Sequence, residues 1–255
     1  MKYAALDFEL GNGRMISACA VGLAVFEDFR MVRRFGSLIR PPEAAGKFHW
    51  GNVRVHGIRR RDVEDAPTFA ELWPQMEADL EGSVIVCHNA AFDTAVLRAC
   101  LEHYGLPLPR CRSLCTVKIS QLVWPEMENH KLNTVAEALG IRLSHHEAGS
   151  DAHAAGLILL RALQATGCAD ADALAAKLDL RPGVLGVTEC KTGEELEREA
   201  KREAEGESRQ KGRARKLRYP RRGRAPRKPR LQKIETNGKG VHENEKGLLR
   251  RSAKH

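Results

Sequence analysis

The chain changes character near residue 190, and this change limits where a folded core can form. Residues 190–255 hold 22 Lys and Arg against 10 Asp and Glu, whereas residues 1–189 hold 20 against 23. Within the basic part, residues 209–233 carry 13 Lys and Arg, three prolines and no acidic residue. These residues contain few apolar side chains, and burying them cannot offset the entropy cost of ordering the backbone. The sequence therefore predicts a slightly acidic folded body followed by a basic and largely disordered tail.

The folded body is expected to be an α/β domain with a mixed sheet. Residues 2–10, 14–28 and 30–41 are short apolar segments joined by compact turns, which is typical of a three-stranded meander. A fourth, buried strand is predicted in residues 83–89, and residues 41–67 look like a long loop. Strands followed by alternating helices and strands indicate the α/β class. The expected helices lie in residues 66–82, 90–105, 113–125, 130–140, 150–166 and 170–180.

Two carboxylates project from the first predicted strand. Asp7 and Glu9 are two residues apart, so their side chains point to the same face of the strand while Phe8 points to the other. Burying paired like charges is costly unless a cation neutralises them. Divalent ions such as Mg²⁺ and Mn²⁺ prefer oxygen ligands. The pair therefore indicates either a metal site or a solvent-exposed strand end.

A third acidic residue, Asp93, lies in the first turn of the helix predicted after the buried strand. The strand ends at His88 and Asn89. Strand ends are where open α/β sheets build their sites. A carboxylate in a first turn is also favoured by the helix dipole, so a purely structural role is the alternative.

A fourth acidic residue, Asp151, lies at the start of an apolar helix that Ser150 is expected to cap. In one continuous helix, His146 and Asp151 would be about 140° apart and would not share a face. If His146 instead lies on a loop entering the helix, with Gly149 allowing the chain to turn, it can fold over the site that Asp151 faces. We therefore expect Asp151 to be a metal ligand and His146 to be a base beside it.

Taken in order, these segments closely resemble the DEDDh branch of the DnaQ-like 3′–5′ exonucleases, which includes the proofreading epsilon subunit of bacterial DNA polymerase III. The resemblance rests on residues 7–9 (DFE), 88–93 (HNAAFD) and 146–151 (HEAGSD), and it spans about residues 2–165. The sequence HGI at residues 56–58 also resembles the segment before the family's first helix. The family often has Thr where this chain has Leu10 and Arg59.

The resemblance implies an RNase H-like fold with a five-stranded mixed sheet flanked by helices. It implies a metal-dependent 3′–5′ exonuclease that uses two divalent ions, Mg²⁺ or Mn²⁺, to release nucleoside monophosphates from DNA 3′ ends. The implied metal ligands, which are also catalytic, are Asp7, Glu9, Asp93 and Asp151, and His146 is the implied general base. The implied substrate contacts are Phe8, Leu10, His56, Gly57, Ile58 and Asn89.

Three parts are predicted along the chain: an exonuclease domain in residues 1–167, a short helical extension in residues 168–189, and the basic tail in residues 190–255. The tail should bind phosphates without sequence preference. The expected partner is nucleic acid with single-stranded or frayed 3′ ends. Because the resembled family includes proofreading subunits, a DNA polymerase is an alternative partner, in replication proofreading or repair. The basic tail suits nucleic acid better than a polymerase groove and favours a stand-alone enzyme.

Two alternatives stay open at this point. An RNA-trimming exonuclease of the same family would have the same site, and only the contacts to the 2′-hydroxyl groups would differ. A module that binds nucleic acid or a polymerase without catalysis is the second alternative, although all five implied catalytic positions are occupied.

The remaining signals bear on location and on the other polar residues. Seven cysteines, an odd number, indicate a reducing compartment. No signal peptide is recognised, and no segment approaches the ~20 apolar residues needed to cross a bilayer. We therefore expect a cytoplasmic protein without a membrane partner. Residues interpreted as structural or solvent-facing are Cys111, Cys115, His88, His145 and His153.

Overall fold

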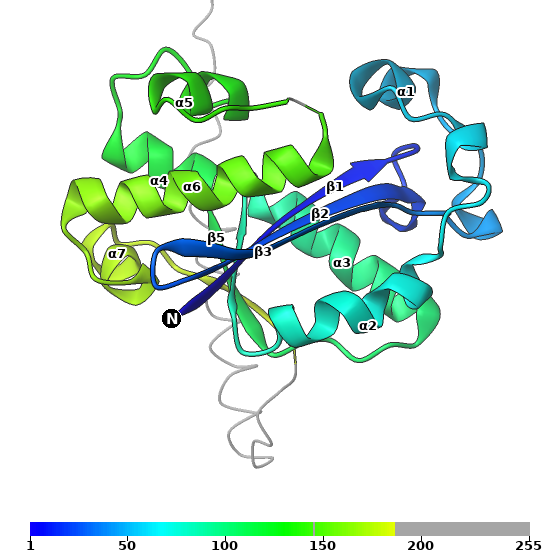
Figure 1. The fold of residues 1–255 in the computed structure, drawn as a ribbon, viewed down its shortest axis with the longest axis horizontal. Coiled ribbons are helices and arrows are strands. Elements are labelled where there is room, and N and C mark those ends of the chain that lie inside the picture. Colours follow the sequence, from blue (N-terminus) through cyan, green and yellow to red (C-terminus); the bar gives the residue numbers. More distant parts are fainter. Residues whose placement is uncertain (145, 187–255) are drawn as a thin grey trace, which may run out of the picture. The chain divides into compact units, whose positions relative to one another are not determined.

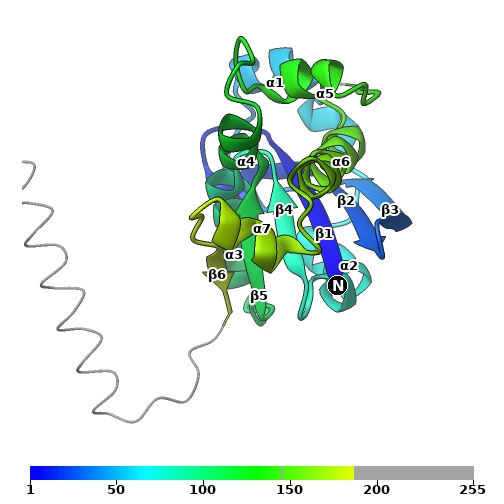
Figure 2. The same ribbon diagram turned by 90° about the vertical axis from the view of Figure 1, so that its left-hand side faces the viewer.

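Strands from both halves of the folded body form one mixed sheet in the computed structural model, which describes residues 1–144 and 146–186. β1 (Lys2–Leu10), β2 (Ala18–Glu27) and β3 (Arg30–Leu38) form the predicted antiparallel meander. β4 (Val84–Cys87) and β5 (Cys111–Cys115) continue the sheet in parallel to β1, and β6 (Gly183–Leu185) pairs antiparallel with β5. The strand order is β3-β2-β1-β4-β5-β6, with β3 and β6 at opposite ends of the sheet (Figure 2).

Helices cover both faces of the sheet (Figure 1). α2 (Phe69–Leu80) and α3 (Ala90–Tyr104) bury their apolar side chains against one face. α4 (Thr116–Val123), α6 (Ala148–Thr166) and α7 (Ala171–Lys177) pack on the other face, and α5 (Leu132–Ala138) packs against α6. The domain thus has the mixed sheet flanked by helices that the sequence predicted.

The alternation of side chains along β1 sets up the site. Leu6 and Phe8 belong to the core cluster beneath α2 and α3, whereas Tyr3 and Ala5 belong to the cluster beneath α6. Because successive side chains of a strand point to opposite faces, Asp7 and Glu9 continue the row of Tyr3 and Ala5 toward α6. The predicted common face of the two carboxylates is therefore confirmed.

Two glycines let α6 approach this face closely. Gly22 lies opposite Asp7 in the pairing of β1 with β2, and a Cβ atom on it would lie 2.0 Å from the carbonyl oxygen of Ala148. A Cβ atom on Gly156 would lie 2.2 Å from the ring of Phe26. Only residues without a side chain fit at these two contacts. The first turn of α6 is therefore held against the strand neighbouring Asp7.

The sheet has six strands rather than the five that the resemblance implied. β5 occupies the start of residues 113–125, which were predicted to be wholly helical, and β6 lies within residues 168–189, which were expected to be a helical extension. The extension also packs on the domain, because Ala171, Leu174 and Ala175 of α7 are buried in the cluster beneath α6. The basic tail and His145 lie outside the described residues.

Residues 41–67 contain short helices where a long loop was expected. They hold α1 (Trp50–His56) and two 3₁₀ turns, Glu43–Ala45 and Arg60–Val63, and a third 3₁₀ turn, Met15–Ser17, precedes β2. Nδ1 of His49 accepts a hydrogen bond from the backbone N–H of Gly51 at the start of α1. No residue of α1 is buried, so the sequence offers no apolar stripe by which to recognise it.

The described residues also bear on the remaining sequence expectations. Within them, no helix combines the length and apolar character needed to span a bilayer. Cys111 is buried, Cys115 is half-buried, and both are free thiols.

Candidate active site

Asp7 and Glu9 lie near the carboxyl end of β1, where the strand leaves its regular pairing. The register between β1 and β2 shifts between Glu9 and Leu10. Irregularities of this kind bend a strand and re-aim its side chains, and they are frequent beside functional sites. β1 lies where the strand order reverses, because the chain continues from β1 to β2 on one side and later returns to β4 on the other side. Open α/β sheets bind ligands at such points.

Asp93 reaches β1 from the first turn of α3. Its Oδ1 accepts a hydrogen bond from the backbone N–H of Phe8 at 3.1 Å, and its side chain is almost completely buried. β4 pairs with β1 only at Tyr3, Ala4 and Ala5, so Phe8 lies beyond the end of that pairing. The carboxylate therefore takes the place that a neighbouring strand would occupy, directly beside Asp7 and Glu9.

Asp151 lies in the first turn of α6, and the loop before it carries His146. The backbone N–H of His146 donates to Oδ2 of Asp151 at 3.0 Å, and His146 adopts a left-handed backbone with φ of 66°. We had expected the turn into the helix at Gly149. The structure makes it at His146 instead. Ser150 was predicted to cap α6, but the side chain of Glu147 does so by accepting from the N–H of Gly149.

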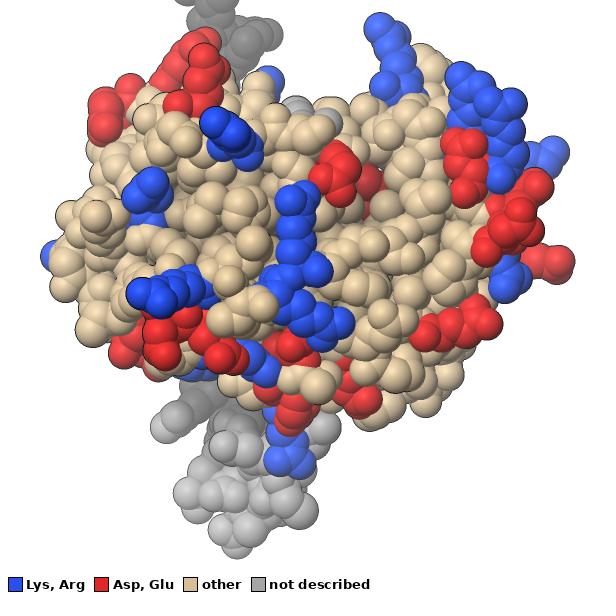
Figure 3. All heavy atoms as spheres, viewed as in Figure 1, with Lys and Arg blue, Asp and Glu red and all other residues tan. Residues whose placement is uncertain are grey.

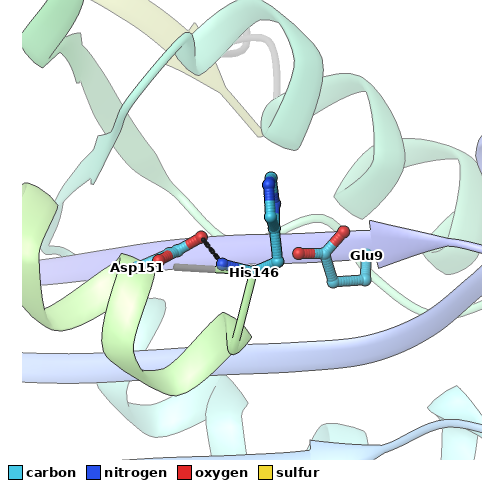
Figure 4. Close-up of side chains that lie close together, drawn as sticks. All are labelled: Glu9, His146 and Asp151. Atoms are coloured by element: carbon cyan, nitrogen blue, oxygen red, sulfur yellow. Dashed lines mark hydrogen bonds between the residues drawn. The ribbon is translucent and has the colours of Figure 1, made fainter. Parts of the chain in front are cut away.

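Three of these groups come close enough to share an ion. The potential ligand atoms of Glu9, His146 and Asp151 all lie within 4.8 Å of one another. Figure 4 shows His146 between the two carboxylates, one from β1 and one from α6. Acidic side chains are visible in the recessed surface between the parts formed by α1 and α5 (Figure 3). The loop geometry that the sequence required for His146 is thus present.

Burial and mutual repulsion raise the pKa values of the carboxylates. Burial raises the pKa of Asp7 well above its usual value, and the nearby Asp93, Asp151 and Glu9 raise it further. Burial and the charge of Asp151 raise the pKa of Glu9 to about 7. The pKa of Asp93 is also well above its usual value, because burial outweighs the opposing hydrogen bond from Phe8. A neighbouring positive charge would therefore stabilise the ionised form of all three carboxylates.

The residues present fit a divalent metal ion. Among the residues that the structure describes, no donor reaches Oδ2 of Asp7, although this oxygen is buried. A buried carboxylate oxygen without a hydrogen bond is costly unless something else compensates it. The surrounding donors are carboxylate oxygens and one imidazole, a set that suits Mg²⁺ or Mn²⁺.

α1 is tied to the end of β1 through one carbonyl group. The carbonyl oxygen of Leu10 accepts hydrogen bonds from Nδ2 of Asn52 at 3.0 Å and from Nε2 of His56 at 3.1 Å. Nδ1 of His56 accepts from the N–H of Ile58, so the proton of this imidazole is on Nε2. Burial lowers the pKa of His56, and the nearby His146 lowers it too. His56 therefore borders the site, and sequence reasoning missed Asn52, which lay in the expected loop.

The residues expected to contact substrate lie in different surroundings. The side chains of Phe8 and Leu10 are core residues, 3% and 5% exposed, so at these two positions only the backbone is available to a ligand. Asn89 is exposed at the start of α3 with φ of 85°. Gly57 is exposed with φ of 78°, and Ile58 is half-buried beside it. Ile58 is joined to the site through Nδ1 of His56, and the contacts of these residues with substrate stay a prediction.

Two other histidines, His88 and His153, have contacts within the domain. Nδ1 of His88 lies 2.9 Å from the hydroxyl of Thr116, and its Nε2 lies 2.9 Å from the carbonyl oxygen of His130. The ring of His153 stacks on Phe26 with centroids 6.1 Å apart. Both agree with the structural interpretation given to them from the sequence.

Known proteins share this domain. Residues 17–159, more than half of the chain, match the exonuclease family RNase T. The chain is 32% identical over 145 residues to the 3′–5′ exonuclease DinG of Bacillus subtilis (strain 168), covering 56% of this chain and 15% of DinG. It is 31% identical over 153 residues to the PolC-type DNA polymerase III of Clostridium perfringens (strain 13 / Type A), covering 60% of this chain and 10% of that protein. The matched segments are thus small parts of much longer relatives.

Solved structures share the fold at low sequence identity. Exonuclease X, solved in complex with 5′ overhanging duplex DNA, has a TM-score of 0.56 and 20% identity, and covers 69% of this chain and 99% of its own. The nuclease domain of 3′hExo, a DEDDh family member bound to rAMP, has a TM-score of 0.53 and 16% identity, and covers 71% and 96%. These likenesses confirm the RNase H-like fold, and the sheet of this chain has six strands in its described residues. The chain belongs to the RNase T exonuclease family, in agreement with its resemblance to the DnaQ-like DEDDh exonucleases.

Proposed function

We propose that this protein is a metal-dependent 3′–5′ exonuclease that releases nucleoside monophosphates from the 3′ ends of nucleic acid. The observation that carries the proposal is the convergence of Glu9, His146 and Asp151 within 4.8 Å, beside the buried Asp7 and Asp93. Four carboxylates around one imidazole make a poor structural core, because their burial is opposed by mutual repulsion. They make a good cradle for cations that act on a phosphodiester.

His146 has the position of a general base in this proposal. It lies at the rim, half-exposed, on a loop whose backbone Asp151 holds. Histidine is the side chain whose charge change falls closest to neutral pH, so it can accept a proton from an attacking water there. Glu9 lies beside the imidazole and would stabilise its protonated form.

The four carboxylates are the proposed metal ligands. Two divalent ions held by Asp7, Glu9, Asp93 and Asp151 would lower the pKa of the attacking water and balance charge on the leaving oxygen. The protein's own part is to hold these four oxygen donors on three rigid elements, β1, α3 and α6. His56, Gly57, Ile58 and Asn89, together with the backbone of Phe8 and Leu10, would line the path of the terminal nucleotide.

DNA is the favoured substrate, and RNA is the second candidate. The relatives named above include a 3′–5′ exonuclease and a DNA polymerase III, which supports a role in replication proofreading or repair and a DNA polymerase as partner. The favoured substrate end is single-stranded or frayed. A fold neighbour bound to rAMP keeps an RNA-trimming activity as the alternative.

Digestion of matched single-stranded DNA and RNA, each labelled at the 5′ end or at the 3′ end, tests the proposal. We expect 5′-labelled DNA to shorten as a ladder from its 3′ end in Mg²⁺ or Mn²⁺, and we expect no digestion in excess EDTA. Asp7→Ala is the matched control, because it removes one proposed ligand. Digestion that persists in EDTA would contradict the metal assignment. A folded, metal-binding protein that cleaves neither substrate would instead be a binding module.

A further inference from the structure

A cavity lies at the carboxyl ends of β4 and β5, next to the helix start that carries Asp93. Its volume is about 250 Å³. Its walls come from the start of α3, the end of β5, the start of α4 and the segment just before β6. The polar residues that line it are Asn89, Thr94, Ser113, Lys118 and Arg181. None of its lining residues belongs to the carboxylate cluster, but Asn89, Ala90, Ala91 and Thr94 belong to the same start of α3 as Asp93.

The cavity is positively charged. Lys118 and Arg181 are both exposed, and neither forms an ion pair with a carboxylate in residues 1–144 or 146–186. None of the residues that line the cavity is acidic. Its surroundings therefore contrast with the neighbouring cluster of carboxylates, and its two cations are available to an anion.

The topology of the sheet places both cations on the same edge as the carboxylates. β1, β4 and β5 are parallel neighbours, so their carboxyl ends lie along one edge of the sheet. β6 runs antiparallel to β5 and pairs Gly183 with Ser113, which brings Arg181 beside the end of β5. Lys118 follows β5 in the first turn of α4. Both cations are thus held by ordered elements rather than by a long loop.

The spacing of the strands suits a nucleic acid strand that crosses this edge. Neighbouring strands lie ~4.8 Å apart, so the end of β5 lies about 10 Å from the end of β1. Stacked nucleotides rise ~3.4 Å each and an extended strand rises more, so this distance corresponds to at most about three nucleotides. In a 3′–5′ exonuclease the 3′-terminal nucleotide binds at the carboxylate cluster. The rest of the strand therefore extends away from the cluster in the direction of its 5′ end.

We propose that this cavity binds the phosphate backbone of the substrate strand, within about three nucleotides to the 5′ side of the scissile bond. Lys118 and Arg181 are the phosphate-binding residues, and Asn89 lines the same cavity. The proposal rests on the exonuclease function proposed above. Contacts of this kind fix the register of a strand without reading its bases, so the cavity would act on DNA of any sequence.

The test is the salt dependence of binding, measured by fluorescence anisotropy with 5′-labelled oligothymidylate of about eight nucleotides. Ca²⁺ replaces the catalytic metal, and NaCl is varied between about 50 and 200 mM. Each phosphate contact to a single strand contributes ~0.7 to the slope of log Kd against log salt. We expect Lys118→Ala and Arg181→Ala each to lower the slope by ~0.7, and the double variant to lower it by about twice as much. Lys118→Arg should retain the slope.

Arg110→Ala is the matched control. Arg110 is an exposed cation that directly precedes β5, at the opposite end of this strand from the cavity, so its loss changes the net charge equally. Equal slopes for Arg110→Ala and the two cavity variants would overturn the proposal, since the effect would then be one of net charge. A change confined to partly duplex oligonucleotides would also overturn it and would assign the cavity to the complementary strand.

Hydrolysis of the p-nitrophenyl ester of thymidine 5′-monophosphate separates this proposal from the proposed function. The ester is too short to reach the cavity. If the wild-type protein does not hydrolyse it but the cavity variants lower the salt slope, the exonuclease assignment fails and the nucleic-acid site stands. If the protein hydrolyses the ester and the slopes do not change, the enzyme stands and the cavity proposal fails.

Discussion

The carboxylate of Asp151 accepts a hydrogen bond from the backbone N–H of His146 at 3.0 Å. His146 adopts a left-handed backbone, which costs roughly 1–2 kcal/mol for a residue other than glycine. One oxygen of Asp151 thus helps to hold the proposed base in a strained conformation, while its charge contributes to the carboxylate cluster. The side chain of Asp151 therefore links the proposed base, His146, to the proposed metal ligands.

Asp151→Asn separates these two roles. The amide oxygen of asparagine can still accept from the N–H of His146, but the negative charge is lost. We expect hydrolysis of a 3′ end to fall by at least ~100-fold, while the melting temperature in EDTA stays the same or rises because repulsion among the carboxylates is relieved. Asp151→Ala should lose both activity and stability. A melting temperature that falls equally in the two variants would contradict this division of roles.

His146→Ala tests the general base. Removing a positioned base lowers kcat by ~10²–10⁴-fold. We expect such a fall with little change in KM, because His146 takes its proton during reaction and the carboxylates remain in place. His103→Ala is the matched control, since His103 is an exposed imidazole at the end of α3, away from the cluster. Wild-type kcat in His146→Ala would rule out this residue as the base.

Gly22→Ala tests whether the close approach of α6 positions the site. The added Cβ would lie 2.0 Å from the carbonyl oxygen of Ala148, so the start of α6 must move. We expect destabilisation of ~1–3 kcal/mol by denaturant unfolding and a larger proportional loss of kcat, because Asp151 moves with the helix. Gly36→Ala on β3 is the control: its Cβ would make only ordinary contacts, at 3.9 Å and beyond. Full activity in Gly22→Ala would show that α6 can adjust without cost to the site.

Stability without metal should fall as pH rises. The pKa of Glu9 is about 7 in the folded protein against 4.5 ordinarily, and the pKa values of Asp7 and Asp93 are raised too. Between about pH 4.5 and 7 the folded state therefore binds more protons than the unfolded state, and the free energy of unfolding decreases with pH. Bound divalent ions should offset this decrease by stabilising the ionised carboxylates.

Thermal unfolding at about pH 5 and about pH 8, with Mg²⁺ and with EDTA, measures this linkage. Metal at 100 times its Kd adds about 2.7 kcal/mol, which is about 5–10 °C for a domain of this size. We expect that rise at about pH 8 and a much smaller one at about pH 5. Asp7→Asn should be more stable than wild type in EDTA at the higher pH and should respond less to metal. An equal metal response at both pH values would contradict the assignment of these carboxylates as ligands.

Truncation after residue 190 tests the basic tail, which lies outside the described residues. The removed part carries 22 Lys and Arg against 10 Asp and Glu. We expect the apparent KM for long DNA to rise at moderate salt, because non-specific attraction to phosphates is lost. The kcat on short oligonucleotides should survive. An equal loss of both parameters on short substrates would mean that the tail does more than tether the substrate.

The parts of the site that the sequence predicted are those with a regular period or an ordered motif. The two-residue spacing of Asp7 and Glu9 was enough to place both on one face of β1. The position of Asp93 at the start of α3 followed from a buried strand predicted to end at His88 and Asn89 and a helix predicted to follow it; β4 ends at Cys87 and α3 begins at Ala90. These are local rules, and tertiary packing did not override them.

The parts that the sequence did not predict lack such local signals. β5 passes directly into α4 at Cys115, whose side chain makes no capping hydrogen bond, so neither a turn nor a cap marks the boundary. Ser150 looked like a cap, but its hydroxyl accepts from the N–H of Ser144 instead. Its role therefore depends on a contact with Ser144, six residues earlier, which the local sequence pattern does not reveal.

The hydrogen bond from Phe8 to Asp93 should also protect the protein from self-association. Beyond Ala5, the edge of β1 has lost its pairing with β4, and an open strand edge is a template on which another chain can add. Asp93 covers this edge with a buried charge. Asp93→Ala would therefore give a protein that is prone to aggregate as well as inactive. Inactive variants for trapping a substrate complex are better made at Glu9 or His146, where the strand edge stays covered.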